Sequence, residues 1–262
     1  SRSAKNIILL GDPQQLEQPQ KASHPEGADV AALSHLLDGK TTMPPAKGIF
    51  IPMTRRLHPS ITSFTSEVFY DNRLSSLPGL EVQKITNPGP LSGAGLFYLP
   101  VRHGRNQNRS DEEVNAISAV CRHLTDGTAT WTNRKGETLP LTKDQILIVA
   151  PYNAQVAALS ESLPGYRIGT VDRFQGQEAA AVIYSMTSSS QHDAPRGMTF
   201  LFNPNRLNVA TSRAQCIALL VASPKLFEAE CRAVNQMRWA NALCRYRELA
   251  TEISSHLVDQ HK

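Results

Sequence analysis

The chain has 262 residues, of which 40% are hydrophobic and 19% charged. This content is enough for an ordinary buried core, so a folded chain is expected rather than a disordered one. The 27 Lys and Arg against 23 Asp and Glu give a net charge of +4, which permits a nucleic-acid partner but does not by itself predict one.

The cysteines and the hydropathy pattern indicate a soluble protein of a reducing compartment. No CxxC spacing occurs, and four cysteines are too few for a disulfide framework in a chain of this length. We predict that all four are small buried hydrophobes: Cys121, Cys216, Cys231 and Cys244. No run reaches the roughly 18 apolar residues of a membrane span, and the N-terminus lacks the apolar core of a signal peptide. We therefore expect no membrane partner and a location in the cytoplasm or the nucleus.

Short apolar runs alternate with helical patterns along the chain, which predicts an α/β fold with a mainly parallel sheet and helices on both faces. Several runs are apolar almost throughout, as strands buried on both faces are. The predicted strands are 6–10, 49–52, 96–100, 146–150, 167–171, 179–186 and 216–222.

Three helices follow from caps and periodicity. Ser110 and Glu113 form a capping box, followed by apolar residues at the spacing of one helix face, from Val114 to Leu124. Residues 153–163 predict a second helix. The spacing of apolar residues from Ala240 to Leu257 predicts a long amphipathic helix.

Segments rich in glycine, proline and polar residues predict the loops. Residues 75–95 and 187–199 are rich in Gly, Pro or polar residues, so both are expected at the surface. Residues 128–143 predict a hairpin with Gly136 in the tight turn. The proline-rich stretch 17–48 is interpreted as a joint between an N-terminal piece and the main body.

Two motifs early in the chain follow predicted strands. GDPQQL (11–16) would place the Gln15 amide where it can bond a phosphate oxygen or a water; the alternative is a plain turn at Gly11. TRRLHP (54–59) has two adjacent arginines, whose forked donors suit phosphate; the alternative is a surface ion pair. Pro59 suits a helix start.

Three further motifs lie in the second half. In APYNAQ (150–155) the Tyr152 ring could stack on a base, or it could be a core tyrosine. In TVDRFQGQE (170–178), Gly176 lets the backbone pass close to a ligand. In RLNVATSRA (206–214), Arg206 and Arg213 are seven residues apart, so in a helix both would point into one cleft and could stabilise charge on a phosphoryl group.

These five motifs, in this order, closely resemble the C-terminal part of superfamily 1 helicases, in the branch of the nonsense-mediated-decay RNA helicase and its DNA-acting relatives. The resemblance covers residues 6–222. It implies a three-layer RecA-like P-loop NTPase fold, with ATP in the cleft between two lobes and single-stranded nucleic acid across the top.

The resemblance also implies a role for each matching residue. Gln15 would sense the γ-phosphate and its attacking water, and Arg56 and Arg213 would contact that phosphate, Arg213 as an arginine finger. Glu178 would bond the ribose hydroxyl, and Gly176 would let the nucleotide approach. Pro151, Tyr152 and Thr170 would lie along the nucleic acid. Arg206 would either act in the nucleotide site or brace the loop around Glu178 through an ion pair.

The sequence departs from the family's pattern in two places. Arg55 stands where relatives often have an aromatic residue that stacks on adenine, although a guanidinium plane can also stack on a base. No GxxxxGK[ST] phosphate loop and no Mg-holding DE pair precede Gly11. We therefore expect residues 1–45 to be a remnant of the first lobe and residues 46–262 to be the second lobe.

The leading hypothesis is the ATP-sensing, nucleic-acid-binding lobe of an ATP-dependent 5′-to-3′ helicase or translocase, whose isolated chain lacks ATPase activity. ATP and Mg²⁺ would act in the intact enzyme, with the Mg²⁺ ligands outside this chain. The first lobe and a DNA or RNA strand would be its partners. The alternative is a stand-alone nucleic-acid-binding or regulatory module. A nucleotide kinase is disfavoured because nothing supplies the phosphate-cradling turn.

Overall fold

The computed structural model describes residues 4–16 and 30–254. Its centre is a six-stranded sheet in the order β11-β4-β10-β9-β7-β8, and every neighbouring pair in it is parallel. The strands are β4 (Gly95–Pro100), β7 (Ile146–Val149), β8 (Arg167–Gly169), β9 (Ala179–Ser185), β10 (Ala214–Ala222) and β11 (Thr251–Glu252). The predicted parallel sheet is confirmed, and its four longest strands match predicted ones.

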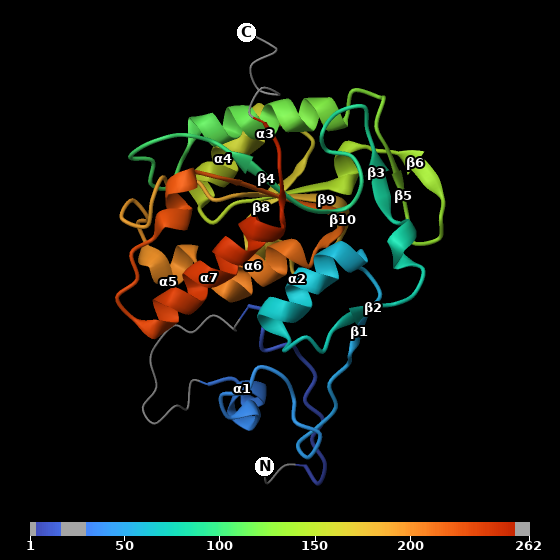
Figure 1. Cartoon of the computed structure of the whole chain (residues 1–262), viewed down its shortest axis with the longest axis vertical. Coiled ribbons are helices and arrows are strands. Elements are labelled where there is room, and N and C mark those ends of the chain that lie inside the picture. Colours follow the sequence, from blue (N-terminus) through green and yellow to red (C-terminus); the bar gives the residue numbers. More distant parts are fainter. Residues whose placement is uncertain (1–3, 17–29, 255–262) are drawn as a thin grey trace.

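Helices cover both faces of this sheet, as Figure 1 shows. One face carries α3 (Asp111–Leu124) and α4 (Asn153–Ser162); the other carries α2 (Pro59–Phe69), α6 (Pro204–Thr211) and α7 (Val234–Leu249). Alternate strand residues divide between the two cores, so that Leu220 packs toward α2, α6 and α7 and Leu219 packs toward α3 and α4. The predicted three-layer α/β arrangement is therefore confirmed.

Smaller elements surround the main layers. A three-stranded antiparallel sheet joins β3 (Lys84–Thr86), β5 (Thr130–Thr132) and β6 (Thr138–Pro140), and β1 (Met53–Thr54) pairs with β2 (Ser75–Ser76). The predicted hairpin is the β5–β6 pair, and Gly136 has φ +80° in its turn. The short helices are α1 (Ala32–Leu37), α5 (Gly197–Leu201), η2 (Leu80–Val82), η3 (Lys143–Gln145), η4 (Val171–Phe174) and η5 (Pro224–Glu228).

Two predicted strands are wrong. Residues 6–10 and 49–52 are irregular, and their apolar side chains are largely exposed, with Leu10 at 89% and Ile49 at 91%. A strand needs a neighbour for its backbone hydrogen bonds, and among the described residues neither run belongs to a sheet. The Pro52 carbonyl oxygen accepts from the Ser75 amide (2.8 Å), next to the start of β1. In Figure 1 this N-terminal part, including α1, lies apart from the main sheet.

The predicted C-terminal helix is too long. It ends at Leu249, and the next residues form β11 on the free edge of β4. Ile253 is then buried in the core on the α3 side, so its side chain belongs to the opposite face of the sheet from α7. Leu257 lies outside the described residues.

The loops and cysteines also differ in part from the prediction. Residues Thr187, Ser188 and Ser189 are buried, as are Leu80, Ile85 and Leu91, so neither predicted loop lies wholly at the surface. Cys121 and Cys216 are buried as predicted, whereas Cys231 and Cys244 are half-buried; all four are free thiols.

Candidate nucleotide and nucleic-acid site

Two predicted site residues lie side by side at the amino ends of β9 and β10. Glu178 directly precedes β9 and Arg213 directly precedes β10, and the Ala179 amide donates to the Arg213 carbonyl oxygen (3.1 Å). The strand register shifts between Ala214 and Ile217, so Gln215 lies in an irregular stretch beside both residues. This edge of the sheet therefore brings the motifs TVDRFQGQE and RLNVATSRA together.

Arg213 is buried, with 3% of its surface exposed, and its hydrogen bonding is incomplete. Its Nη2 donates to Gln15 Oε1 (2.8 Å), but its Nε has no hydrogen-bond partner among the described residues. Burial first, and then the positive charge of Arg56, lowers the pKa of Arg213. A buried donor without an acceptor, in a guanidinium close to a second one, is the arrangement of an anion site.

Gln15 is oriented by a chain of side chains that the sequence did not reveal. Its Nε2 donates to Asp12 Oδ2 (2.9 Å), which also accepts from the Tyr70 hydroxyl (2.5 Å), and Asn208 Nδ2 donates to the Tyr70 oxygen (3.0 Å). Burial, followed by the charge of Asp12, raises the pKa of Tyr70, so Tyr70 keeps its proton as a donor. Asp12 and Asn208 stand inside two of the motifs, which was a usable signal, whereas nothing in the sequence marked Tyr70.

Arg56 and Glu178 bind each other. Arg56 Nε lies 2.7 Å from Glu178 Oε2, and Arg56 Nη1 donates to the Ser212 carbonyl oxygen (2.9 Å). Gln215 Nε2 donates to the other Glu178 oxygen (2.9 Å). The buried Gln83 side chain donates to the Arg56 carbonyl oxygen (2.8 Å) and so fixes the backbone of this arginine.

Arg55 and Gly176 are both exposed beside these residues. Within the described residues, the Arg55 side chain makes no hydrogen bond or ion pair that would hold it in place. Gly176 has φ +82°, a conformation that favours glycine, and a Cβ there would meet nothing within 4 Å. The space beside the Gly176 backbone is therefore open.

Arg206 and Arg213 do not point into one cleft, and this prediction is wrong. Helix α6 ends at Thr211, so Arg213 lies beyond it and the two arginines do not share a helix face. Arg206 instead lies 3.5 Å from Asp172 and over the Phe200 ring, at 4.2 Å from its centroid. Asp172 belongs to the 170–178 segment, so the contact is the ion pair that a bracing role predicts.

The predicted nucleic-acid residues lie at the opposite, carboxyl edge of the sheet. Val149 of β7 is paired with Gly169 of β8, so Pro151 and Thr170 follow the ends of adjacent parallel strands. Pro151 is buried and Thr170 is half-buried. Tyr152 is 7% exposed and packs against Phe200 with ring centroids 5.6 Å apart, which agrees with the alternative of a core tyrosine.

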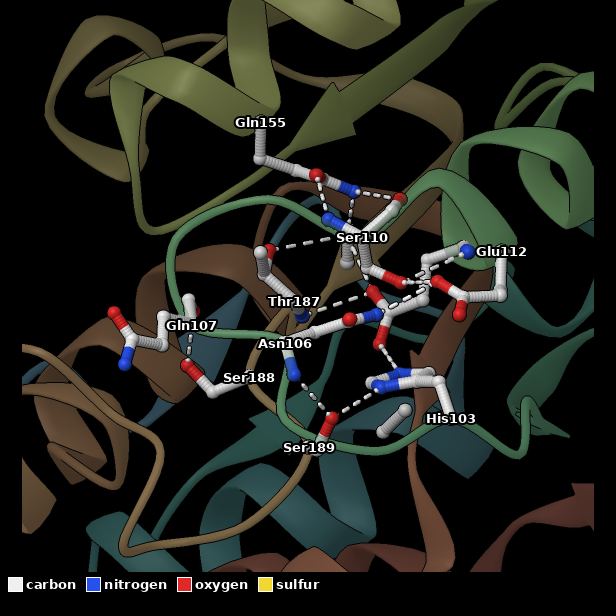
Figure 2. A network of polar contacts seen from close by, with 12 residues as sticks. His103, Asn106, Gln107, Ser110, Glu112, Gln155, Thr187, Ser188 and Ser189 are labelled. Atoms are coloured by element: carbon white, nitrogen blue, oxygen red, sulfur yellow. Dashed lines mark hydrogen bonds and ion pairs between the residues drawn. The ribbon is translucent and has the colours of Figure 1, made fainter.

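A polar network lies at this carboxyl edge (Figure 2), and its Ser188 hydroxyl lies 3.4 Å from the Tyr152 hydroxyl oxygen. Glu113 Oε2 accepts from the Ser185 hydroxyl (2.5 Å) and the Thr187 amide (2.9 Å), and Glu113 Oε1 lies 3.1 Å from His103 Nε2. His103 Nδ1 contacts the Ser189 hydroxyl (2.7 Å). The network therefore ties the segment after β9 to the loop between β4 and α3.

The same network corrects the predicted capping box. Ser110 does cap α3, since its hydroxyl accepts from the Glu113 amide (3.2 Å). However, the Ser110 amide donates to Gln155 Oε1 (2.8 Å), and Glu113 turns its carboxylate to Ser185 and Thr187 instead. A serine followed three residues later by a glutamate is compatible with a capping box and with a glutamate that is buried elsewhere. The sequence pattern alone could therefore not reveal the network.

Residues 4–16 and 30–254 contain no cluster of three or more His, Cys, Asp or Glu side chains placed to hold a metal ion. Within those ranges, none of the helices has the length and apolar character required to cross a bilayer.

Comparison with known proteins gives a family match over most of the chain. The model of the family described as AAA domain matches residues 33–225. This span includes four of the five motifs, from TRRLHP to RLNVATSRA, and begins after GDPQQL.

The curated relatives carry helicase and nucleic-acid-binding names. "Regulator of nonsense transcripts 1 homolog" from Drosophila melanogaster is 27% identical over 94% of this chain and 20% of its own length. "ATP-dependent helicase upf1" from Schizosaccharomyces pombe is 26% identical over 85% and 24%, and "DNA-binding protein SMUBP-2" from Rattus norvegicus is 28% identical over 81% and 22%. The chain spans between a fifth and a quarter of the length of these relatives, and the resemblance to superfamily 1 helicases is confirmed.

Among solved structures, the chain resembles the C-terminal domain of a possible DNA helicase from Lactobacillus plantarum WCFS1. The TM-score is 0.41 at 18% identity, with 76% of this chain and 98% of that chain covered.

Proposed function

The chain belongs to the AAA-domain family, and from this membership we propose that it is the ATP-sensing, nucleic-acid-binding lobe of an ATP-dependent superfamily 1 helicase or translocase. One observation carries the proposal: the buried Arg213, whose Nε has no partner in the part of the chain that the structure describes, lies close enough to Arg56 to feel its charge. Arg213 at the amino end of β10 and Arg56 beside Glu178 at the amino end of β9 suit an anion with several acceptor oxygens.

The residues at this edge fit the phosphates and ribose of ATP. Arg213 would place its free Nε on a phosphate oxygen and act as an arginine finger, Arg56 would add a second guanidinium, and Gln15 would orient the attacking water. Glu178 would accept from a ribose hydroxyl, and the open space beside Gly176 would admit the nucleotide. The exposed Arg55 would stack on adenine. Bound ATP supplies the phosphoanhydride that is hydrolysed; the chain's own residues hold and orient it.

The pairing of Arg56 with Glu178 gives these two residues a second state. Each now occupies the hydrogen-bonding groups that the other would offer to a nucleotide. Glu178 keeps Gln215 as a donor when Arg56 leaves, and Arg56 keeps the Ser212 carbonyl oxygen as an acceptor. We propose that nucleotide binding exchanges this ion pair for contacts to ribose and phosphate.

Strand binding is proposed for the carboxyl edge of the sheet. Pro151, Tyr152 and Thr170 would lie along a single strand, with Tyr152 as a packed support rather than an open stacking surface. Relatives are named as RNA helicases and as DNA-binding proteins, so either kind of strand is consistent with them. We further propose that the intact protein moves from 5′ to 3′ and that its partner is a first lobe. The Mg²⁺ would be held by residues outside this chain.

The alternative function that we propose is a stand-alone nucleic-acid-binding or regulatory module. The 262 residues contain no GxxxxGK[ST] loop, so this chain offers no phosphate-cradling turn of its own. We therefore propose that the isolated chain has no ATPase activity.

The test compares the purified chain with the chain joined to a first lobe that carries the GxxxxGK[ST] loop. We expect no ATP turnover from the chain alone, and turnover stimulated by single-stranded DNA or RNA from the joined protein. Arg213→Ala in the joined protein should lower kcat by about 10³-fold or more while strand affinity is unchanged. Arg213→Lys keeps the charge but loses the fork, so it should be nearly as inactive. Equal loss of turnover and strand binding would identify Arg213 as a structural residue, and turnover by the isolated chain would contradict the proposal.

A further inference from the structure

An aromatic and cationic cluster lies next to Tyr152, in the segment between β9 and β10. Phe200 of α5 has the Arg196 guanidinium carbon 3.8 Å from its ring centroid and the Arg206 guanidinium carbon at 4.2 Å. Its ring also lies 5.6 Å from that of Tyr152. Arg196 is the residue directly before α5, and Arg206 is near the start of α6.

The cluster belongs to the carboxyl edge of the sheet. Tyr152 follows the end of β7, and Asp172, which pairs with Arg206, follows the end of β8. These are the two strand ends that carry Pro151 and Thr170. Arg196 is therefore held beside the residues proposed to contact the nucleic acid. It comes from a later segment of the chain than any of them.

The charges of this cluster are not balanced. Arg206 has Asp172 at 3.5 Å, and that carboxylate is itself half exposed to solvent. Arg196 is exposed and, among the described residues, forms no ion pair. One guanidinium therefore keeps all its donors available for an outside anion.

The Arg196 guanidinium is also restricted in position. Stacking on an aromatic ring fixes its plane, which lowers the entropy lost when its donors bind a ligand. The segment that carries it is anchored by the network of Figure 2, in which the Ser188 hydroxyl donates to the Gln107 carbonyl oxygen (2.6 Å) and the Ser189 hydroxyl accepts from the Asn106 amide (2.9 Å). A fixed and unpaired guanidinium on an anchored segment is suited to a phosphate group.

We infer that Arg196, held on Phe200, binds a backbone phosphate of single-stranded nucleic acid at the carboxyl edge of the sheet. The contact is to the phosphodiester group, so it does not select a base sequence. The inference rests on the proposed strand-binding function and adds to it a residue from a segment that none of the five motifs includes.

The experiment measures binding of labelled oligodeoxythymidylate and oligouridylate to the purified chain by fluorescence anisotropy over a series of salt concentrations. Arg196→Ala should weaken binding several-fold and make the slope of log K against log salt shallower by about 0.7, the value for one lost phosphate contact on a single strand. Phe200→Leu keeps the charge but removes the support, and should weaken binding with a smaller change in slope.

Arg134→Ala is the matched control. Arg134 is exposed in the β5–β6 turn, and its removal changes the net charge by the same amount. It should leave affinity and slope unchanged. Circular dichroism of each variant checks that the fold is intact, which is expected because Arg196 is at the surface.

The outcomes separate the two proposals. If the unaltered chain binds neither oligonucleotide, the proposed strand-binding function fails. If the chain binds but Arg196→Ala behaves like Arg134→Ala, only the present inference is overturned. A parallel titration with a fluorescent ATP analogue identifies the other source of phosphate: a loss confined to that analogue would assign Arg196 to the nucleotide and overturn the strand contact.

Discussion

Two buried tyrosines differ in whether their hydroxyl group has a hydrogen-bond acceptor. Tyr184 of β9 and Tyr246 of α7 both line a small apolar cavity between the sheet and α6. The Tyr246 hydroxyl donates to the Ala218 carbonyl oxygen (2.6 Å) and lies 3.2 Å from that of Phe97. The Tyr184 hydroxyl has no partner among the described residues. The two side chains thus have the same chemistry and opposite hydrogen-bonding states.

We expect Tyr184→Phe to leave the free energy of unfolding unchanged or to raise it by up to about 1 kcal/mol, because it removes an unpaired buried hydroxyl. Tyr246→Phe should lower it by about 1–3 kcal/mol, because a buried carbonyl oxygen loses its donor. Urea unfolding of both variants measures the difference. Equal destabilisation by the two substitutions would contradict this assignment.

At the residue scale, sequence motifs identified the candidate nucleotide site only in part. Gln15 contacts Arg213, and Arg56 contacts Glu178, at the edge where β9 and β10 begin. Tyr70 could not be found, since it joins the site through Asp12, 58 positions away, and is held there by Asn208, 138 positions away. Periodicity describes neighbours in the chain, and this contact depends on how α2 and α6 pack.

Among the helices, α2 begins with an uncommon cap. His58 Nδ1 accepts from the Ser60 amide (3.1 Å), and Pro59 occupies the first helical position, as predicted. Burial lowers the pKa of His58 below its ordinary value of 6.5, although Glu81 opposes this shift. The neutral imidazole is thus the form that the folded chain prefers, and the one that can accept the hydrogen bond.

Acid should lower the stability of the folded chain through His58. Above pH 6.5 both folded and unfolded states hold His58 neutral; as the pH falls below 6.5 the unfolded state takes up the proton first, so stability is lost. His58→Asn keeps a capping acceptor without a titrating group, and should lose less stability than the unaltered chain between pH 8 and pH 5. Urea unfolding at the two pH values tests this. An identical loss in both proteins would show that His58 does not titrate with folding.

The elements predicted correctly are those whose signal is local. The helices α3 and α4 and the long strands β4, β7, β9 and β10 each carry their own apolar pattern. The failures depend on neighbours: residues 6–10 have no strand to pair with, and Thr251 and Glu252 become β11 only because the edge of β4 is free. A single-sequence pattern does not contain these pairings.

For the molecule as a whole, the two hydrophobic cores are built almost entirely from the second unit that we propose. Their buried residues begin at Leu57 and end at Ile253. The earlier part contributes a partly buried contact from Leu16 and polar contacts such as Thr42 to Asp71 (2.9 Å). This distribution supports a boundary near residue 45.

Deletion of residues 1–45 should therefore leave a protein that unfolds in one cooperative transition, at a lower urea concentration because Tyr70 and Asn208 lose Asp12 and the Gln14 carbonyl oxygen. Circular dichroism during urea unfolding measures this. Loss of the cooperative transition would show that the first 45 residues belong to the same folding unit.

Helix α6 separates Arg206 from Arg213 along the chain and connects the two edges of the sheet. It runs from Arg206 at the carboxyl edge toward Arg213 beyond its other end, and its eight residues extend about 12 Å. The two guanidinium groups have separate partners, Asp172 for Arg206 and Gln15 for Arg213. Five of its residues, from Leu207 to Thr211, are buried, so the helix cannot bend locally without opening the core. A displacement passed along α6 between the two edges would therefore move the helix as one body.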